Sequence, residues 1–165
     1  FEQLVKDGKI RYYGISSIRP NVIREYVSKS NIVSVMMQYS LLDRRPEETC
    51  LPLLAESNIG VLARGSLATG LLVNKTADPY LNYSEDEVHR AASAIQAISG
   101  ESRKPSHTAL RFVLQQQGIS SAVVGIRTME QVKDVLATLR TPELTESEVQ
   151  YLRASLPVNY YEQHR

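Results

Sequence analysis

Small hydroxyl, amide and glycine residues, rather than acids or histidines, follow the apolar segments that are typical of buried strands. They stand in four short stretches: residues 14–17 (GISS), 38–40 (QYS), 64–70 (RGSLATG) and 125–128 (GIRT). In parallel α/β folds, functional groups gather where the strands end. Hydroxyls, amides and the amino ends of helices orient carboxamides and bind phosphate, but they are poor acids and bases. These residues therefore favour ligand binding over acid–base catalysis.

Structural roles are the alternatives for the same residues. Ser16 and Ser17 could cap a helix, Gln38 could be a satisfied buried amide, and Arg127 could be a solvated surface charge. The glycines at the two ends of 65–70 have the spacing of a P-loop, but Leu71-Leu72 stand where that motif has Lys-Ser/Thr. A nucleoside-triphosphatase is therefore disfavoured.

Composition excludes several other classes of protein. The chain has 165 residues, 42% of them apolar and 22% charged, with a net charge of +1, which is typical of one globular domain. Without blocks of like charge, neither nucleic acid nor an anionic membrane is an expected partner, and the apolar runs are too short to span a bilayer. Cys50 is the only cysteine, and His89 and His107 lie far apart, so we expect no disulfide, no metal site and a cytoplasmic location.

Short apolar segments alternate with amphipathic ones along the chain. Four strands are expected, over residues 10–16, 31–39, 61–63 and 121–124, and the second is apolar enough for burial on both faces. Helices are expected to begin at Pro20, Pro46, Ser84, Pro105, Thr128 and Thr145. The helices at Ser84, Thr128 and Thr145 start with capping-box sequences. The fourth helix is expected to span residues 105–117. Parallel β/α units at this spacing predict half of a TIM (β/α)8 barrel, with a doubly wound open sheet as the alternative.

The first residues look like the end of a helix. Phe1, Leu4 and Val5 have helical spacing, and Gly8 stops the pattern as a C-cap would. We expect that the beginning of this helix is missing and that residues 1–165 are a single partial domain of a longer protein.

Four segments resemble those of the aldo-keto reductase family, and they occur in the family's order. They are residues 9–17 (KIRYYGISS), 37–42 (MQYSLL), 62–72 (LARGSLATGLL) and 124–132 (VGIRTMEQV). The resemblance implies a TIM barrel that binds an extended NADP(H) without a Rossmann domain. It also implies that this chain is the C-terminal half of that barrel, with the N-terminal half absent.

The resemblance assigns most of these residues to parts of the cofactor. Ser16, Ser17 and Gln38 would bond the nicotinamide carboxamide, and Arg64 stands where many members of the family have a stacking aromatic ring. Residues of the 64–70 segment would lie along the pyrophosphate, namely Gly65, Ser66, Leu67, Ala68 and Gly70.

The last segment would bind the adenosine end of the cofactor. With Gly125 before them, Arg127 and Thr128 would meet the 2′-phosphate at the start of a helix, where charge and helix dipole agree. Gln131 and Asp134 match positions that contact adenine. The family often has Asn in the position of Val135, so one adenine contact is expected to be lost.

The family's Asp-Tyr-Lys-His catalytic set lies in the half that this chain does not match. We therefore expect an NADPH-dependent oxidoreductase that reduces aldehydes or ketones as a whole protein, with no catalytic residue in this chain and no activity for the chain alone. The alternative is a non-catalytic nucleotide-binding or regulatory module of the same fold. Half a barrel leaves bare strand edges, so we also expect the chain to self-associate or to pair with the missing half.

Overall fold

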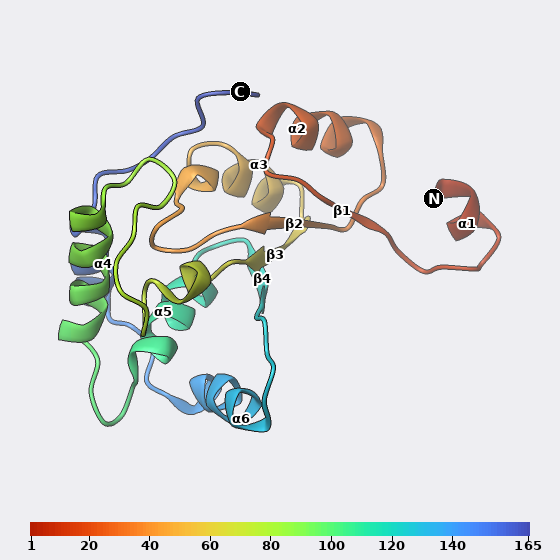
Figure 1. The fold of residues 1–165 in the computed structure, drawn as a ribbon. Coiled ribbons are helices and arrows are strands. Elements are labelled where there is room, and N and C mark those ends of the chain that lie inside the picture. The colour runs from red at the N-terminus through yellow and green to blue at the C-terminus, as the bar shows by residue number, and fades with distance from the viewer.

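The computed structural model describes residues 1–165 and contains one parallel four-stranded sheet (Figure 1). Its strands are β1 (Gly14–Ser16), β2 (Ser34–Gln38), β3 (Gly60–Arg64) and β4 (Ile119–Val123). The spatial order is β1-β2-β3-β4, the order of the sequence, and all pairings are parallel. A doubly wound sheet reverses its strand order at a switch point. The unreversed order therefore excludes that alternative and agrees with a barrel.

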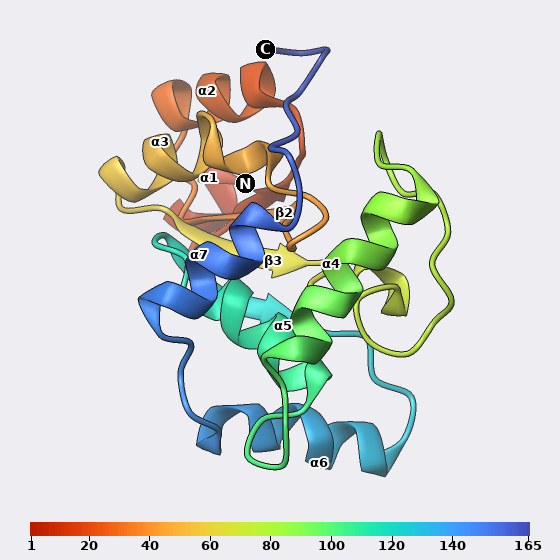
Figure 2. The same cartoon turned by 90° about the vertical axis from the view of Figure 1, so that its left-hand side faces the viewer.

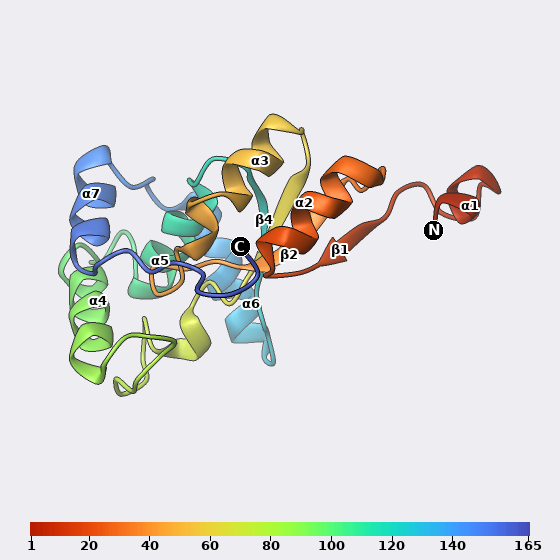
Figure 3. The ribbon, with the colours of Figure 1, turned by 90° about the horizontal axis from the view of Figure 1, so that it is seen from above.

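One short helix precedes β1, and further helices connect the strands and follow the last one. They are α1 (Glu2–Lys6), α2 (Pro20–Lys29), α3 (Cys50–Glu56), α4 (Glu85–Ala97), α5 (Pro105–Leu114), α6 (Met129–Ala137) and α7 (Glu146–Ala154). In Figure 2, α4, α5 and α7 lie together, whereas Figure 3 shows α1 standing apart from the body of the molecule. None of the helices combines the length and apolar character that a bilayer span requires.

Only one face of the sheet is fully buried. Along β2, Val35 and Met37 have no exposed surface, whereas their neighbours Ser34, Met36 and Gln38 are partly exposed. The strand β3 alternates in the same way. The buried side packs on α2, α3 and α5, so within this chain the 31–39 strand, which was expected to be buried on both faces, is fully buried on one. The other face lacks a second layer in this chain.

Several expected boundaries shift because hydrogen bonding, rather than hydropathy, ends an element. Residues 10–13 precede β1 and have no strand beside them, since β2 begins only at Ser34. Pro46 lies in the 3-10 helix η1 (Arg45–Glu47), and α3 starts at Cys50. The fourth expected helix ends at Leu114, three residues early. Gly8, with φ of +69°, ends the first helix as expected.

Two of the three expected capping boxes are confirmed. The Ser84 hydroxyl accepts a bond from the Glu87 amide, and the Glu87 carboxylate accepts from the Ser84 amide at 2.8 Å. Thr145 and Glu148 make the same reciprocal pair at the start of α7. Each box satisfies amides that have no partner inside the helix, which fixes where α4 and α7 begin.

Candidate functional site

A cavity of about 740 Å³ lies between the loop that follows β3 and the segment that joins β4 to α6. Eight of the residues expected to bind the cofactor line it: Gly65, Ser66, Leu67, Gly70, Gly125, Arg127, Gln131 and Asp134. The two walls come from neighbouring strands, because β3 pairs with β4. The sheet therefore brings together segments that are far apart in the sequence.

The loop after β3 has an unusual backbone. Gly65 and Gly70 have positive φ, and so do Ala68 (+46°) and Thr69 (+56°), where a side chain makes that conformation costly. Ala68 has no exposed surface and packs into the core instead of lining the cavity. At Gly65 a Cβ would lie 3.2 Å from the Cγ of Gln38, so close packing as well as φ favours glycine there. Strained backbone of this kind gathers at ligand sites.

Ser66 presents a polar atom that the protein does not satisfy. The residue is 3% exposed, and its hydroxyl has no hydrogen-bond partner, although the residue lines the cavity. An unpaired buried hydroxyl costs free energy unless another molecule supplies the bond. The site therefore fits a ligand that brings a polar atom, such as a phosphate oxygen, to Ser66.

The opposite wall carries Arg127 and the start of α6. Arg127 is exposed and forms no ion pair, so its guanidinium is free to bind an anion. The Thr128 hydroxyl accepts a bond from the Gln131 amide at 3.2 Å. The expected reciprocal bond is absent, because the Gln131 side-chain oxygen accepts from the Arg127 amide at 2.7 Å instead. The capping-box expectation at Thr128 is thus wrong in its second half. A Cβ on Gly125 would meet nothing within 4 Å.

Asp134 ties α6 to the start of α5. Its carboxylate accepts from the Lys104 ammonium at 3.1 Å and from the Ser106 hydroxyl at 2.9 Å, and His107 Nε2 lies 3.2 Å away. Burial by itself raises the pKa of Asp134, but the bonds from Ser106 and Lys104 outweigh it and hold the pKa below its usual range. Asp134 lines the cavity with much of its hydrogen-bonding capacity already used.

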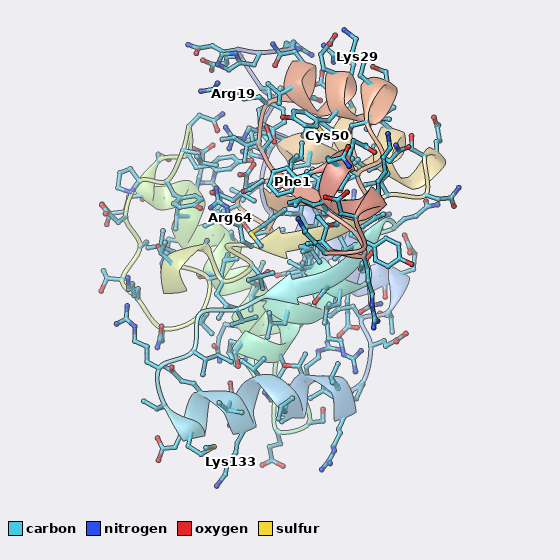
Figure 4. All side chains as sticks on the ribbon, turned by 90° about the vertical axis from the view of Figure 1, so that its right-hand side faces the viewer. Phe1, Arg19, Lys29, Cys50, Arg64 and Lys133 are labelled. Carbon is cyan, nitrogen blue, oxygen red and sulfur yellow. The ribbon has the colours of Figure 1, made fainter.

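The remaining expected residues lie at the ends of β1, β2 and β3, outside this cavity. Ser16, Ser17 and Arg64 line a second hollow of about 550 Å³. The Ser17 hydroxyl also accepts from the Arg19 amide at 3.1 Å, a bond of the kind expected for a structural serine. In Figure 4, Arg64 lies beside the sheet, whereas Lys133 on α6 points away from the body of the molecule.

Gln38 is the residue whose surroundings the sequence did not predict. It lies opposite Arg64 in the sheet register, and the Arg64 guanidinium donates to its amide oxygen at 3.1 Å. Its amide nitrogen donates to the hydroxyl of Tyr80 at 2.7 Å. Tyr80 belongs to the turn-rich segment 74–83, which carries no motif that would have marked it.

The combined site is rich in donors and poor in acids and bases. Its hydroxyls, guanidinium groups and helix terminus suit a long ligand with phosphate groups at one end and a carboxamide at the other. A nicotinamide dinucleotide has these groups.

Comparison with known proteins agrees with this chemistry. The model of the aldo/keto reductase family matches residues 1–157. The chain is 44% identical to the uncharacterized oxidoreductase YqkF of Bacillus subtilis, over 100% of the chain and 56% of that protein. It is 25% identical to the NADH-specific methylglyoxal reductase of Escherichia coli, over 83% of the chain and 46% of that protein. The chain thus spans about half the length of the curated relatives it matches.

Solved structures show the same likeness. The holo form of aldo-keto reductase AKR11C1 from Bacillus halodurans superposes with a TM-score of 0.90 at 42% identity, over 100% of this chain and 57% of that one. The glycerol dehydrogenase AKR11B4 from Gluconobacter oxydans has a TM-score of 0.77 at 24% identity, over 93% and 51%, which supports the fold alone. The expected fold class, parallel β/α units of a (β/α)8 barrel, is confirmed. By its family match, its structure and its ordered motifs, this chain belongs to the aldo/keto reductase family.

Proposed function

We propose that this chain is the cofactor-binding half of an NADPH-dependent oxidoreductase that reduces aldehydes or ketones to alcohols. The observation that carries the proposal is the 740 Å³ cavity, which has the unpartnered hydroxyl of Ser66 on one wall and the unpaired guanidinium of Arg127 on the other. Both groups suit phosphate oxygens. A nicotinamide cofactor bound here would supply the hydride.

The residues of the chain would bind and orient that cofactor. Ser16, Ser17 and Gln38 would bond the carboxamide, which selects the face of the ring that is presented to the substrate. The backbone of residues 65–70 would lie along the pyrophosphate, where glycines permit close approach. The guanidinium of Arg64 offers a plane for stacking in place of an aromatic ring, although one of its nitrogens already donates to Gln38.

The other wall would hold the adenosine end. Arg127 and Thr128 would contact the 2′-phosphate, because a free cation and the amino end of α6 meet there. Gln131 and Asp134 would lie near adenine. Asp134 would contact adenine only through the carboxylate acceptor sites that the bonds from Lys104 and Ser106 leave free.

A proton donor for the carbonyl is the part that this chain would not supply. The strand ends carry hydroxyls, an amide and a guanidinium, and none of these groups readily gives up a proton near neutral pH. We place the acid in a part of the protein that these 165 residues do not include. The same observation favours a second candidate, a nucleotide-binding or regulatory module that turns over little substrate.

Calorimetry would test the proposal. NADPH and then NADH would be titrated into the full-length protein and into the 165-residue chain, which has no tryptophan for a quenching assay. Micromolar binding to the full-length protein with a preference for NADPH supports the assignment, and absence of binding to the full-length protein refutes it. Reduction of a simple aldehyde by the full-length protein would then distinguish an enzyme from a regulatory module.

A further inference from the structure

We propose that Tyr80 is a positioning residue of the cofactor site, which acts by holding the amide of Gln38 in one orientation together with Arg64. The inference rests on the function proposed above, since it concerns the group that would bond the nicotinamide carboxamide. Tyr80 stands 42 residues after Gln38 in a segment without helix or strand, and the fold brings the two side chains to 2.7 Å.

Arg64 determines which end of the Gln38 amide faces it. A guanidinium can only donate hydrogen bonds, so the amide oxygen must point to Arg64, as it does at 3.1 Å. If the amide were turned over, its N–H groups would face the N–H groups of Arg64. The cation therefore excludes one of the two orientations.

Tyr80 holds the other end of the same amide. Its hydroxyl accepts from the Gln38 nitrogen, and this second contact fixes the side-chain torsions that Arg64 leaves free. A primary amide has two N–H donors and two acceptor sites. One of each is used, so one donor and one acceptor remain in defined directions. A carboxamide is itself one donor group and one acceptor group, which makes the two amides complementary.

The position of Tyr80 is itself well determined. Its amide and carbonyl exchange hydrogen bonds with those of Tyr83 at 3.1 and 3.0 Å, around a turn in which Leu81 has φ of +54°. Tyr83 is buried, and its hydroxyl donates a hydrogen bond to the Pro157 carbonyl oxygen at 2.8 Å. The turn is thereby fixed to the C-terminal segment. Burial, with a smaller contribution from Asp43, raises the pKa of Tyr80, so its hydroxyl stays protonated.

Replacement of Tyr80 by phenylalanine would test this role in the full-length protein. Tyr80→Phe keeps the ring but removes the acceptor, and the loss of one such bond should weaken NADPH binding about three- to tenfold. The matched control is Tyr151→Phe, which removes an exposed hydroxyl that makes no hydrogen bond on α7. We expect its dissociation constant to equal that of the wild type.

A truncated cofactor distinguishes positioning from a general structural effect. The compound 2′-phospho-ADP-ribose lacks the nicotinamide, so Tyr80→Phe should leave its affinity unchanged. In a Gln38→Ala background, Tyr80→Phe should have no further effect on NADPH binding, because the amide through which it acts is gone. Equal weakening for both ligands, or an undiminished effect without Gln38, would overturn the inference.

The two proposals fail in different ways. If wild-type protein binds neither NADPH nor 2′-phospho-ADP-ribose, the proposed function is wrong. If wild-type protein binds NADPH and Tyr80→Phe binds it equally well, only the role of Tyr80 is wrong.

Discussion

The backbone amide of Arg127 donates to the side-chain oxygen of Gln131 at 2.7 Å, one residue before Thr128, the N-cap of α6. This bond folds residue 127 back onto the first turn of α6. The guanidinium of Arg127 therefore starts from a fixed backbone position at the edge of the cavity, and it forms no salt bridge.

Arg127 should decide the preference for the 2′-phosphate. Arg127→Ala removes a charge-assisted bond of about 1.5–3 kcal/mol, so NADPH should bind roughly 10- to 100-fold more weakly while NADH, which has no 2′-phosphate, binds as before. Calorimetric titration of both cofactors measures this. The control is Lys133→Ala, which removes an exposed cation that points away from the body on the same helix (Figure 4). An unchanged NADPH affinity in Arg127→Ala would show that the phosphate lies elsewhere.

Gly65 should be intolerant of a methyl group. Its φ of +72° disfavours any side chain, and a Cβ would press on Gln38 at 3.2 Å, so Gly65→Ala should lower the free energy of unfolding by about 1–2 kcal/mol. Gly125→Ala has open space around its Cβ, and thermal denaturation should find it as stable as the wild type. Equal stability of the two variants would contradict the strain at Gly65.

Glu47 should be important for stability and not for binding. Its carboxylate accepts from the Tyr39 hydroxyl at 2.7 Å and from Arg44 and Arg153 at 3.1 Å, and the Arg44 side chain is 5% exposed. Glu47→Gln leaves two guanidinium groups without a counter-charge, so urea denaturation should show a loss of about 3 kcal/mol.

The exposed pair of Glu25 and Lys29 on α2 is the control for that measurement. Glu25→Gln should cost less than about 1 kcal/mol, because water screens the charges. A similar small loss in Glu47→Gln would mean that the buried charges find other partners.

Glu148 should make stability depend on pH. Burial by itself raises its pKa, but the bonds from the Thr145 amide and the Arg103 guanidinium outweigh burial and lower the pKa below the ordinary value of 4.5. Its stabilising contribution is therefore complete above pH 4.5 and is lost as the pH falls through the lower, folded-state pKa. In melting curves at successive pH values, Glu148→Gln should flatten this acid-side decline, whereas Glu146→Gln, on the exposed first turn of α7, should leave it unchanged.

The isolated 165-residue chain should self-associate. Its sheet ends at the unpaired edges of β1 and β4, and Val123 on β4 is 41% exposed. Such edges recruit other strands, so sedimentation velocity should reveal dimers or larger species, and Val123→Lys should reduce them. A stable monomer that unfolds cooperatively would contradict this prediction.

Local patterns in the sequence determined much of the fold. The capping pairs Ser84–Glu87 and Thr145–Glu148 fixed two helix starts, because each box satisfies its own amides within four residues. The four strand segments and their spacing predicted parallel β/α units, and the ordered motifs included eight of the residues that line the cavity. All of these signals depend on neighbours along the chain or on a known pattern of such neighbours.

Contacts between distant residues depended on the tertiary structure alone. The helices that pack on one side of the sheet decided that only one face of β2 is fully buried in this chain, and the approach of α5 drew Asp134 into bonds with Lys104 and Ser106. The turn at residues 80–83 brought Tyr80 to Gln38 because Tyr83 is anchored to Pro157. A hydrogen bond between residues 42 positions apart leaves no local pattern in the sequence, since either side chain could meet its requirement with many other partners.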